Sequence, residues 1–255
     1  MQLWTPTHAK TLLPAIIVML LLGALLRLTL GKKDLKIRMI PFQIVASLLF
    51  ILELGKQVLS LYQGYDLYCL PFHFCSMLIF LPVIMAFYRG KHQQTVRCIT
   101  TAVCAAVFIL TAIYPDLIYS AQAVQEFTTN FFSFHTVAFH NLAMLLFVLI
   151  PALDLHEPAP KGEPKKVLLF ILCFCAVSAT MAHLLKTNFN NFYTCNIAPL
   201  EAVRQAVEAA LGSVAAAIFY VLIVTALDLL FVFGSYWFFR LIHKLLKKTE
   251  PVTTA

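Results

Sequence analysis

Charged residues are scarce in this sequence. Asp, Glu, Lys and Arg together make up 12% of its 255 residues, which is about half of their share in a soluble globular domain, and hydrophobic residues make up 61%. This composition excludes a water-soluble globular protein. Linkers, low-complexity stretches and internal repeats are also missing, so we expect a single transmembrane domain over residues 1–255.

Seven apolar stretches are long enough to cross the hydrocarbon core of a bilayer, which takes about 20 residues of helix. The first is longer than the apolar run of a secretory signal, and no small-residue cleavage site follows it, so we expect it to remain as a helix. The sequence predicts an all-α, polytopic, seven-transmembrane-helix bundle, with spans at about residues 11–30, 39–61, 67–88, 96–119, 131–153, 167–185 and 213–239.

The few cations are sorted along the chain. Fifteen of the 19 Lys and Arg residues lie at the ends of the first, third, fifth and seventh spans or in the loops that follow them. The positive-inside rule assigns these loops and the C-terminus to the cytoplasm and the N-terminus to the outside of a cell membrane. A net charge of +7 would also suit a nucleic-acid partner, but this sorting indicates topology and contact with anionic lipid instead. We therefore expect no nucleic-acid partner.

Metal-binding and disulfide spacings are absent from the sequence. None of the seven cysteines forms a CxxC pair, and we expect no metal ion and no cofactor. Cys69 and Cys195 are predicted near the outer face, but no spacing rule indicates a disulfide between them.

The polar side chains of the predicted spans gather in their outer halves. Ionisable groups are costly inside a bilayer, so each is a candidate for a functional site. They are Glu53, Lys56, His73, His135, His140, His183 and Lys186, accompanied by Cys75 and the asparagines Asn188, Asn190 and Asn191, with Asp228 nearer the middle of the last span. The pattern predicts a polar cavity that opens toward the outer leaflet.

Helical periodicity limits which of these groups can act together. At about 100° per residue, we expect His73 and Cys75 to face opposite ways at the start of the third span, whereas Phe72 and Cys75 point into much the same space. The side chains of His135 and His140 would point about 140° apart around the helix axis, which is too far apart for a metal pair on one helix. His140, like His183, is most simply an interhelical hydrogen-bonding residue.

Two roles stay open for several of these residues. Glu53 and Lys56 are three residues apart and can neutralise each other, or Glu53 can orient a catalytic imidazole. Asn188 and Asn191 can build a turn or stabilise an oxyanion. Asp228 can be a buried hydrogen-bonding group or a site residue.

Three motifs carry a resemblance to a known family. Residues 70–75 (LPFHFC), residues 131–135 (FFSFH) and residues 188–191 (NFNN) resemble, in kind and order, motifs of the YwaF family of bacterial integral membrane proteins, which is related to the eukaryotic transmembrane protein 164 family. The resemblance implies a bacterial plasma-membrane location. It also implies an acyl-transfer enzyme that acts on membrane phospholipid through a cysteine and a histidine.

Residue by residue, the resemblance assigns His73 to the histidine beside the family's cysteine and His135 to its catalytic histidine. The position of that cysteine holds Phe72 here, so Cys75 would have to replace it.

The resulting hypothesis is a phospholipid acyltransferase or acyl hydrolase. Its catalytic residues are His135, Cys75 and His73, and its substrate-binding residues are Asn188, Asn191, Glu53, Lys56 and His140. The alternative is a transporter or ligand-binding membrane protein that uses the same polar cavity. A seven-span receptor is disfavoured, because the Asp-Arg-Tyr and Asn-Pro-x-x-Tyr signatures and a lysine in the last span are missing. The sequence indicates no oligomeric state.

Overall fold

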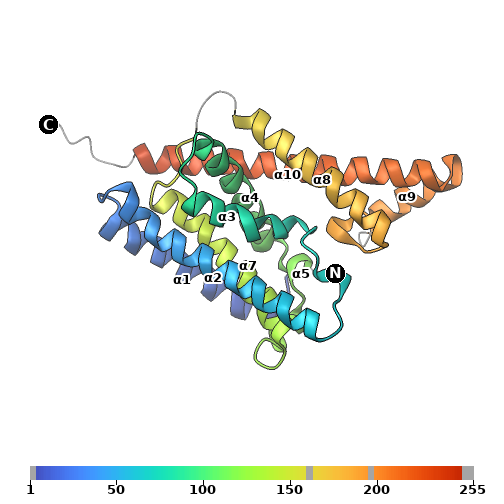
Figure 1. Ribbon diagram of the computed structural model, residues 1–255, viewed down its shortest axis with the longest axis horizontal. Coiled ribbons are helices and arrows are strands. Elements are labelled where there is room, and N and C mark those ends of the chain that lie inside the picture. Colours follow the sequence, from blue (N-terminus) through green and yellow to red (C-terminus); the bar gives the residue numbers. More distant parts are fainter. Residues whose placement is uncertain (1–3, 159–162, 195–197, 249–255) are drawn as a thin grey trace.

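The computed structural model describes residues 4–158, 163–194 and 198–248, and these ranges form helices joined by turns and loops (Figure 1). Within them, six helices are long and apolar enough to cross a membrane, so the chain is an all-α polytopic membrane protein. They correspond to six of the seven predicted spans: α1 (Pro6–Leu30), α2 (Leu35–Tyr62), α4 (Gln93–Ile113), α7 (Phe131–Ala152), α8 (Glu163–Leu185) and α10 (Ser213–Lys248). Two residues of the sequence analysis lie outside the described residues: Cys195, and Lys161, which is one of the fifteen sorted cations.

Local sequence signals explain where several of these helices begin and end. Thr5 caps α1 by accepting a hydrogen bond from the backbone N–H of His8, and Asn130 caps α7 through the N–H groups of Phe132 and Ser133. Helix α4 ends at Ile113, earlier than the predicted span, because Tyr114 precedes a proline and is held out of the helical region. The rest of that predicted span forms the short helix α5 (Pro115–Ile118).

The third predicted span is not a continuous helix, so this expectation is wrong. Residues Leu67–Cys69 and Phe74–Ser76 form two separate 3-10 turns, and the α-helix α3 occupies only Met77–Phe87. Pro71 has no backbone N–H and holds Leu70 in an extended conformation (φ −62°, ψ 145°). At 1.5 Å per residue, the 11 residues of α3 measure only about 16 Å, well short of a bilayer core.

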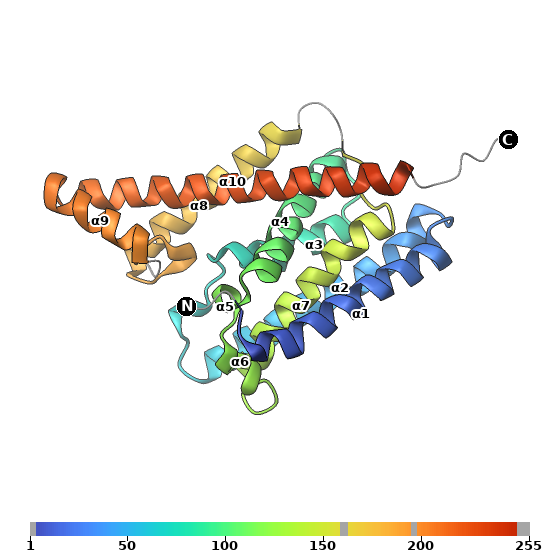
Figure 2. The same ribbon diagram turned by 180° about the vertical axis from the view of Figure 1, so that it is seen from behind.

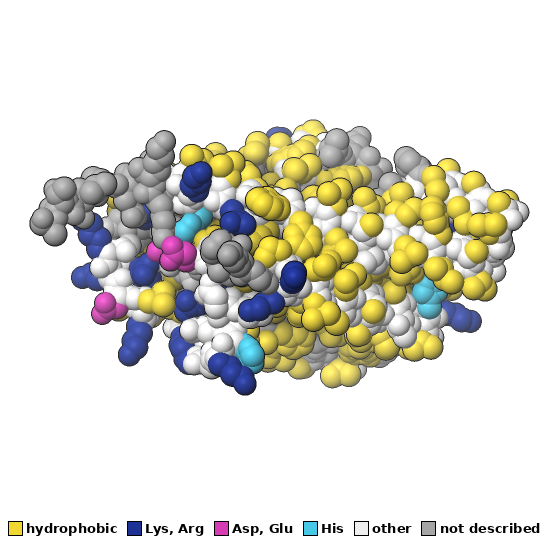
Figure 3. All heavy atoms as spheres, turned by 90° about the horizontal axis from the view of Figure 1, so that it is seen from above, with side chains coloured by type: hydrophobic (Ala, Val, Ile, Leu, Met, Phe, Trp, Pro, Cys, Tyr) yellow, Lys and Arg dark blue, Asp and Glu magenta, His cyan; other side chains and the backbone are white. Residues whose placement is uncertain are grey.

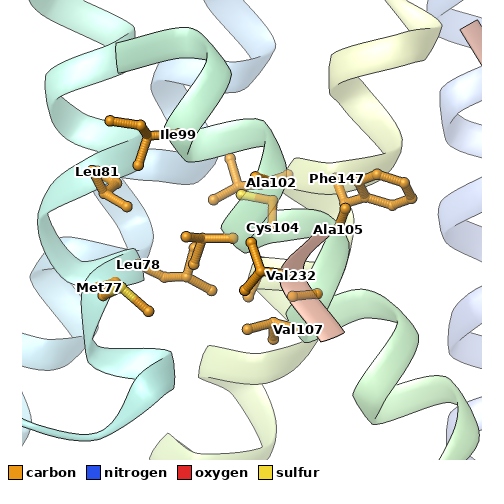
Figure 4. Close-up of a cluster of buried hydrophobic side chains, with 14 of the residues drawn as sticks. Met77, Leu78, Leu81, Ile99, Ala102, Cys104, Ala105, Val107, Phe147 and Val232 are labelled. Carbon is orange, nitrogen blue, oxygen red and sulfur yellow. The ribbon is translucent and has the colours of Figure 1, made fainter. Parts of the chain in front are cut away.

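The helices pack in two groups around α4, one formed by α1, α2 and α7 and the other by α8 and α10. Helix α7 lies between α1 and α2, and these three run side by side in both views (Figures 1 and 2). Helix α4 contacts α3, α7, α8 and α10. Figure 4 shows the apolar core where they meet, with Leu78 and Leu81 of α3, Ala102 and Ala105 of α4, Phe147 of α7 and Val232 of α10. The small residues of α4 allow its neighbours to approach closely, as is usual between membrane helices.

Two short helices at the end opposite to the basic loops were not predicted. Helix α6 (Ala121–Gln125) packs on α1 and α7, and helix α9 (Ala198–Leu211) packs on α10. Arg204 of α9 forms ion pairs with Glu201 (2.7 Å) and Glu208 (2.9 Å), and its guanidinium lowers the pKa of Glu201 to about 2. Because one face of α9 carries these charged residues, its sequence has no long apolar stretch that would have predicted it.

The opposite end of the bundle carries the basic residues. Arg27 of α1 donates to the carbonyls of Pro151 and Ala152, and Arg38 of α2 donates to that of Leu153 (2.8 Å). The arginines therefore satisfy the backbone groups at the C-terminal end of α7. On the face seen in Figure 3, Lys and Arg side chains gather at the left end, and hydrophobic side chains cover most of the remainder.

Gly23 sets the approach of α1 to α7. In Gly23→Ala the new Cβ would lie 2.6 Å from Cγ1 of Val148, and a valine has few rotamers to which it can move. We expect the variant to lose about 1–3 kcal/mol of unfolding free energy, measured as a lower melting temperature in detergent.

Gly55→Ala is the matched control, because its Cβ would lie 3.5 Å from Cζ of Phe131 in an ordinary contact. Its melting temperature should stay the same or rise with the better helix propensity of alanine. Equal melting temperatures for the two variants would contradict the close packing at Gly23.

Candidate functional site

A polar cavity of about 650 Å³ lies inside the bundle, in the half away from the basic loops. It is bounded by the second half of α2, the irregular segment before α3, the start of α7 and the turn after α8. All eight residues predicted for the site line it: Glu53, Lys56, His73, Cys75, His135, His140, Asn188 and Asn191. The structure thus brings together residues from four separate parts of the chain.

The carboxylate of Glu53 is at the centre of the polar contacts. It lies 2.7 Å from Nζ of Lys56 on the same helix and 2.9 Å from Nε2 of His135 on α7. The side chain of Glu53 is 5% exposed and that of His135 is 8% exposed. Both roles considered for Glu53 are therefore present in the geometry, because it pairs with Lys56 and also holds an imidazole.

Gln57 is a third partner of Glu53 that the sequence interpretation missed. Its amide donates to Oε1 of Glu53 (2.7 Å) and to the carbonyl of Cys69 (2.8 Å), and its oxygen accepts from the hydroxyl of Tyr65 (2.9 Å). Burial raises the pKa of Tyr65, which keeps it a donor. The spacing of four residues from Glu53 to Gln57 was the available signal, since such pairs share a helix face.

The tautomer of His135 follows from its contact with Glu53. A carboxylate only accepts hydrogen bonds, so Nε2 of His135 carries the proton and Nδ1 of the neutral ring holds the lone pair. This arrangement can orient the ring and stabilise it once it is protonated, as the acidic member of a nucleophile, base and orienter set does.

His73 and Cys75 line the same cavity, so the expectation that they face opposite ways is wrong. It assumed a continuous helix, whereas His73 is extended (φ −80°, ψ 154°) and precedes the turn Phe74–Ser76. The predicted equivalence of Phe72 and Cys75 fails for the same reason. Phe72 packs its ring on Phe189 and is not among the residues lining the cavity.

The rings of His73 and His140 are each fixed by a backbone carbonyl. Nε2 of His73 donates to the carbonyl of Tyr68 (3.1 Å), and Nδ1 of His140 donates to that of Thr136 (2.7 Å). Carbonyls only accept, so the other ring nitrogen of each neutral histidine holds a lone pair. The expected interhelical bond of His140 is instead a bond within α7.

The three asparagines after α8 have different structural roles. The Oδ1 of Asn188 accepts the backbone N–H groups of Tyr193 (3.2 Å) and Thr194 (3.0 Å), so this side chain builds the turn. Asn190 and Asn191 have left-handed backbones (φ 49° and 59°), which asparagine tolerates better than most residues. The NH2 group of Asn188 donates to Oδ1 of Asn191 (3.4 Å). The NH2 group of Asn191 is not part of that contact.

Asn190, which the sequence placed in the polar cluster without a catalytic or binding role, is tied to α10. Its Nδ2 lies 2.7 Å from Oδ2 of Asp228, and the same oxygen accepts from Sγ of Cys175 (3.6 Å). Asp228 therefore acts as a hydrogen-bonding group that holds the turn against α10. The sequence pattern alone could not pair residues 38 positions apart.

In the described part of the chain, no group of three His, Cys, Asp or Glu side chains is placed to hold a metal ion. What the cavity offers is a buried carboxylate, three imidazoles, two thiols (Cys69 and Cys75), an ammonium and several amides. Such a set can move protons, stabilise developing negative charge and provide a sulfur nucleophile.

The helices and this cavity define a polytopic membrane protein that collects its polar groups inside the bundle. The chain belongs to the TMEM164 family, whose sequence profile matches residues 3–236. This match covers α1 to α9 and most of α10, and with them every residue that lines the polar cavity. No curated protein and no solved structure matches the chain.

Glu53→Gln tests the central ion pair. The substitution keeps the shape of the side chain but leaves the half-buried Lys56 without its counter-charge, and breaking a buried pair costs about 3–5 kcal/mol. We expect a large fall in melting temperature, measured in detergent.

The double variant Glu53→Gln/Lys56→Met removes both charges and should recover much of this loss. A double-mutant cycle measures the coupling between the two residues. Losses that simply add would contradict a stabilising contact between them.

Proposed function

We propose that the polar cavity is the site of acyl transfer or acyl hydrolysis on membrane phospholipid. The observation that carries the proposal is the 2.9 Å contact between Glu53 and His135 beside a cavity that Cys75 also lines. An imidazole held by a buried carboxylate is a general base, and a thiol is the nucleophile that such a base activates.

The reaction has two steps. The sulfur of Cys75 attacks the ester carbonyl carbon of the lipid, and its proton passes to the lone-pair nitrogen of His135 or of His73. The carbon–oxygen bond then breaks, and the histidine returns the proton to the leaving hydroxyl, which leaves a thioester. In the second step a hydroxyl of another lipid, or water, attacks the thioester and restores the thiol.

Charge develops on the carbonyl oxygen in both steps. The side-chain NH2 group of Asn191 is the better candidate donor for it, because the NH2 group of Asn188 already donates to Oδ1 of Asn191. Lys56 and His140 would bind the polar part of the lipid. No hydrogen bond among the described residues joins Cys75 to a histidine, and nucleophile–base contacts often tighten only when substrate binds.

Cys75→Ser and His135→Ala test this mechanism. We expect each to lower the turnover of labelled phospholipid in proteoliposomes by at least about 100-fold, and mass spectrometry of the wild type should find the acyl group on Cys75. Cys173→Ser and His183→Ala are matched controls, because both residues are exposed and neither lines the cavity. Turnover that survives in both site variants would rule out the assignment.

A second candidate function is binding or transport of a polar solute. It is favoured by the irregular backbone of residues 63–76 next to a buried ion pair, since transporters often place broken helices at their binding sites. Uptake into the same proteoliposomes, without acyl turnover and lost in Asp228→Asn, would select this function.

We also propose that the basic end faces the cytoplasm of a bacterial cell. The irregular segment and α3 together would then cross the membrane between α2 and α4, which brings the number of crossings to seven. The N-terminus would lie outside and the polar cavity in the outer half. Non-helical backbone at this depth is allowed where protein surrounds it.

A membrane-impermeant maleimide tests this orientation. It should label Tyr62→Cys in intact cells, because residue 62 lies at the outer end and is 88% exposed. Lys91→Cys, at the basic end, should react only after the cells are permeabilised. Wild-type labelling is subtracted as the background, and the opposite pattern would reverse the orientation.

A further inference from the structure

A second cavity, of about 750 Å³, lies beside the polar one. It is formed mainly between α4 and α10, and its lining is largely apolar, including Phe108, Ile113, Val224, Leu227, Phe231 and Phe238. Its lining on α10 extends from Tyr220 to Phe238, which is about 27 Å of helix. The cavity is therefore elongated along α10.

The two cavities adjoin each other. Phe74, Leu110, Leu117, Asn190 and Asn191 line both of them. The amides of the asparagine turn thus lie where a polar compartment meets an apolar one. A molecule that occupies both compartments must have a polar group joined to a long hydrocarbon group.

The apolar cavity also reaches the outer surface of the bundle. Ile113, Leu227, Leu230 and Phe238 line it, yet they are 57%, 45%, 71% and 44% exposed. In a membrane protein such apolar surface faces hydrocarbon, so a lipid chain can enter sideways without crossing water. A chain gains no hydrophobic energy by leaving one hydrocarbon phase for another, so its selection depends on fit.

Gly234 leaves a gap in the wall of this cavity. A Cβ added to Gly234 would meet nothing within 4 Å, although the residue lies inside the 36-residue helix α10. Glycine weakens a helix relative to alanine, so the gap has a cost to the fold. Gly234 lies six residues beyond Asp228, or about 9 Å along the helix from the junction with the polar cavity.

We propose that the apolar cavity binds one hydrocarbon chain of the phospholipid and that Gly234 sets the length and bulk of the chain that fits. This inference rests on the proposed function for the identity of the lipid, whose ester group would lie in the polar cavity. Chain binding can nevertheless be measured without any turnover.

The experiment uses the full chain in lipid nanodiscs and a phospholipid with a photoreactive diazirine at the end of one acyl chain. After illumination, mass spectrometry locates the labelled residues. In the wild type, labelling should concentrate on the parts of α4 and α10 that line the cavity. Gly234→Trp should lower this labelling at least tenfold, and Gly234→Leu should shift it toward lipids with shorter chains.

Leu222→Trp is the matched control, because it adds an indole to the same helix at a residue that is 62% exposed and does not line the cavity. It should label as the wild type does. Gly234→Ala should do the same, and Gly234→Leu keeps the test valid where the tryptophan variant fails to fold.

The outcomes separate this inference from the proposed function. Labelling that depends on Gly234 in a protein without acyl turnover supports the chain site and removes the catalytic proposal. If the protein turns over lipid and Gly234→Trp changes neither its chain-length preference nor its photolabelling, the chain site is overturned and the catalytic proposal stands. Labelling no stronger at the cavity than at Leu222 also overturns the chain site.

Discussion

The buried carboxylate of Glu53 is the contact on which the polar interior depends. It joins α2 to α7 through His135, and it offsets the charge of Lys56. An ionised group at this depth is costly unless it is paired and hydrogen-bonded, and Gln57 supplies a further hydrogen bond. The same contacts that make the charge tolerable also fix the ring of His135, so stability and the proposed chemistry depend on one side chain.

The irregular segment before α3 depends on its neighbours in a similar way. Backbone groups that leave a helix inside a membrane must find other partners. The carbonyls of Tyr68, Cys69 and Phe72 accept hydrogen bonds from His73, Gln57 and Ser178, respectively. These side chains come from three parts of the chain, and together they hold Cys75 and His73 toward the cavity.

The turn after α8 borders both cavities. The bond from Asn190 to Asp228 holds it against α10, while the left-handed backbone of Asn190 and Asn191 turns the chain sharply. A polar compartment next to an apolar one suits an amphipathic ligand. The match to the TMEM164 family, over residues 3–236, covers every residue that lines the polar compartment and all of those that line the apolar one except Phe238.

The sequence by itself determined the membrane class, the six long helices and eight of the polar residues that line the cavity. It could do so because hydropathy and the cost of buried charge are local properties of a chain. Only the tertiary structure decided that α3 begins at Met77, that Cys75 and His73 face one cavity, and that Asn190 bonds to Asp228. These features depend on contacts between residues far apart in the chain, such as Glu53 with His135 and Asn190 with Asp228, and helical periodicity carries no information about such contacts.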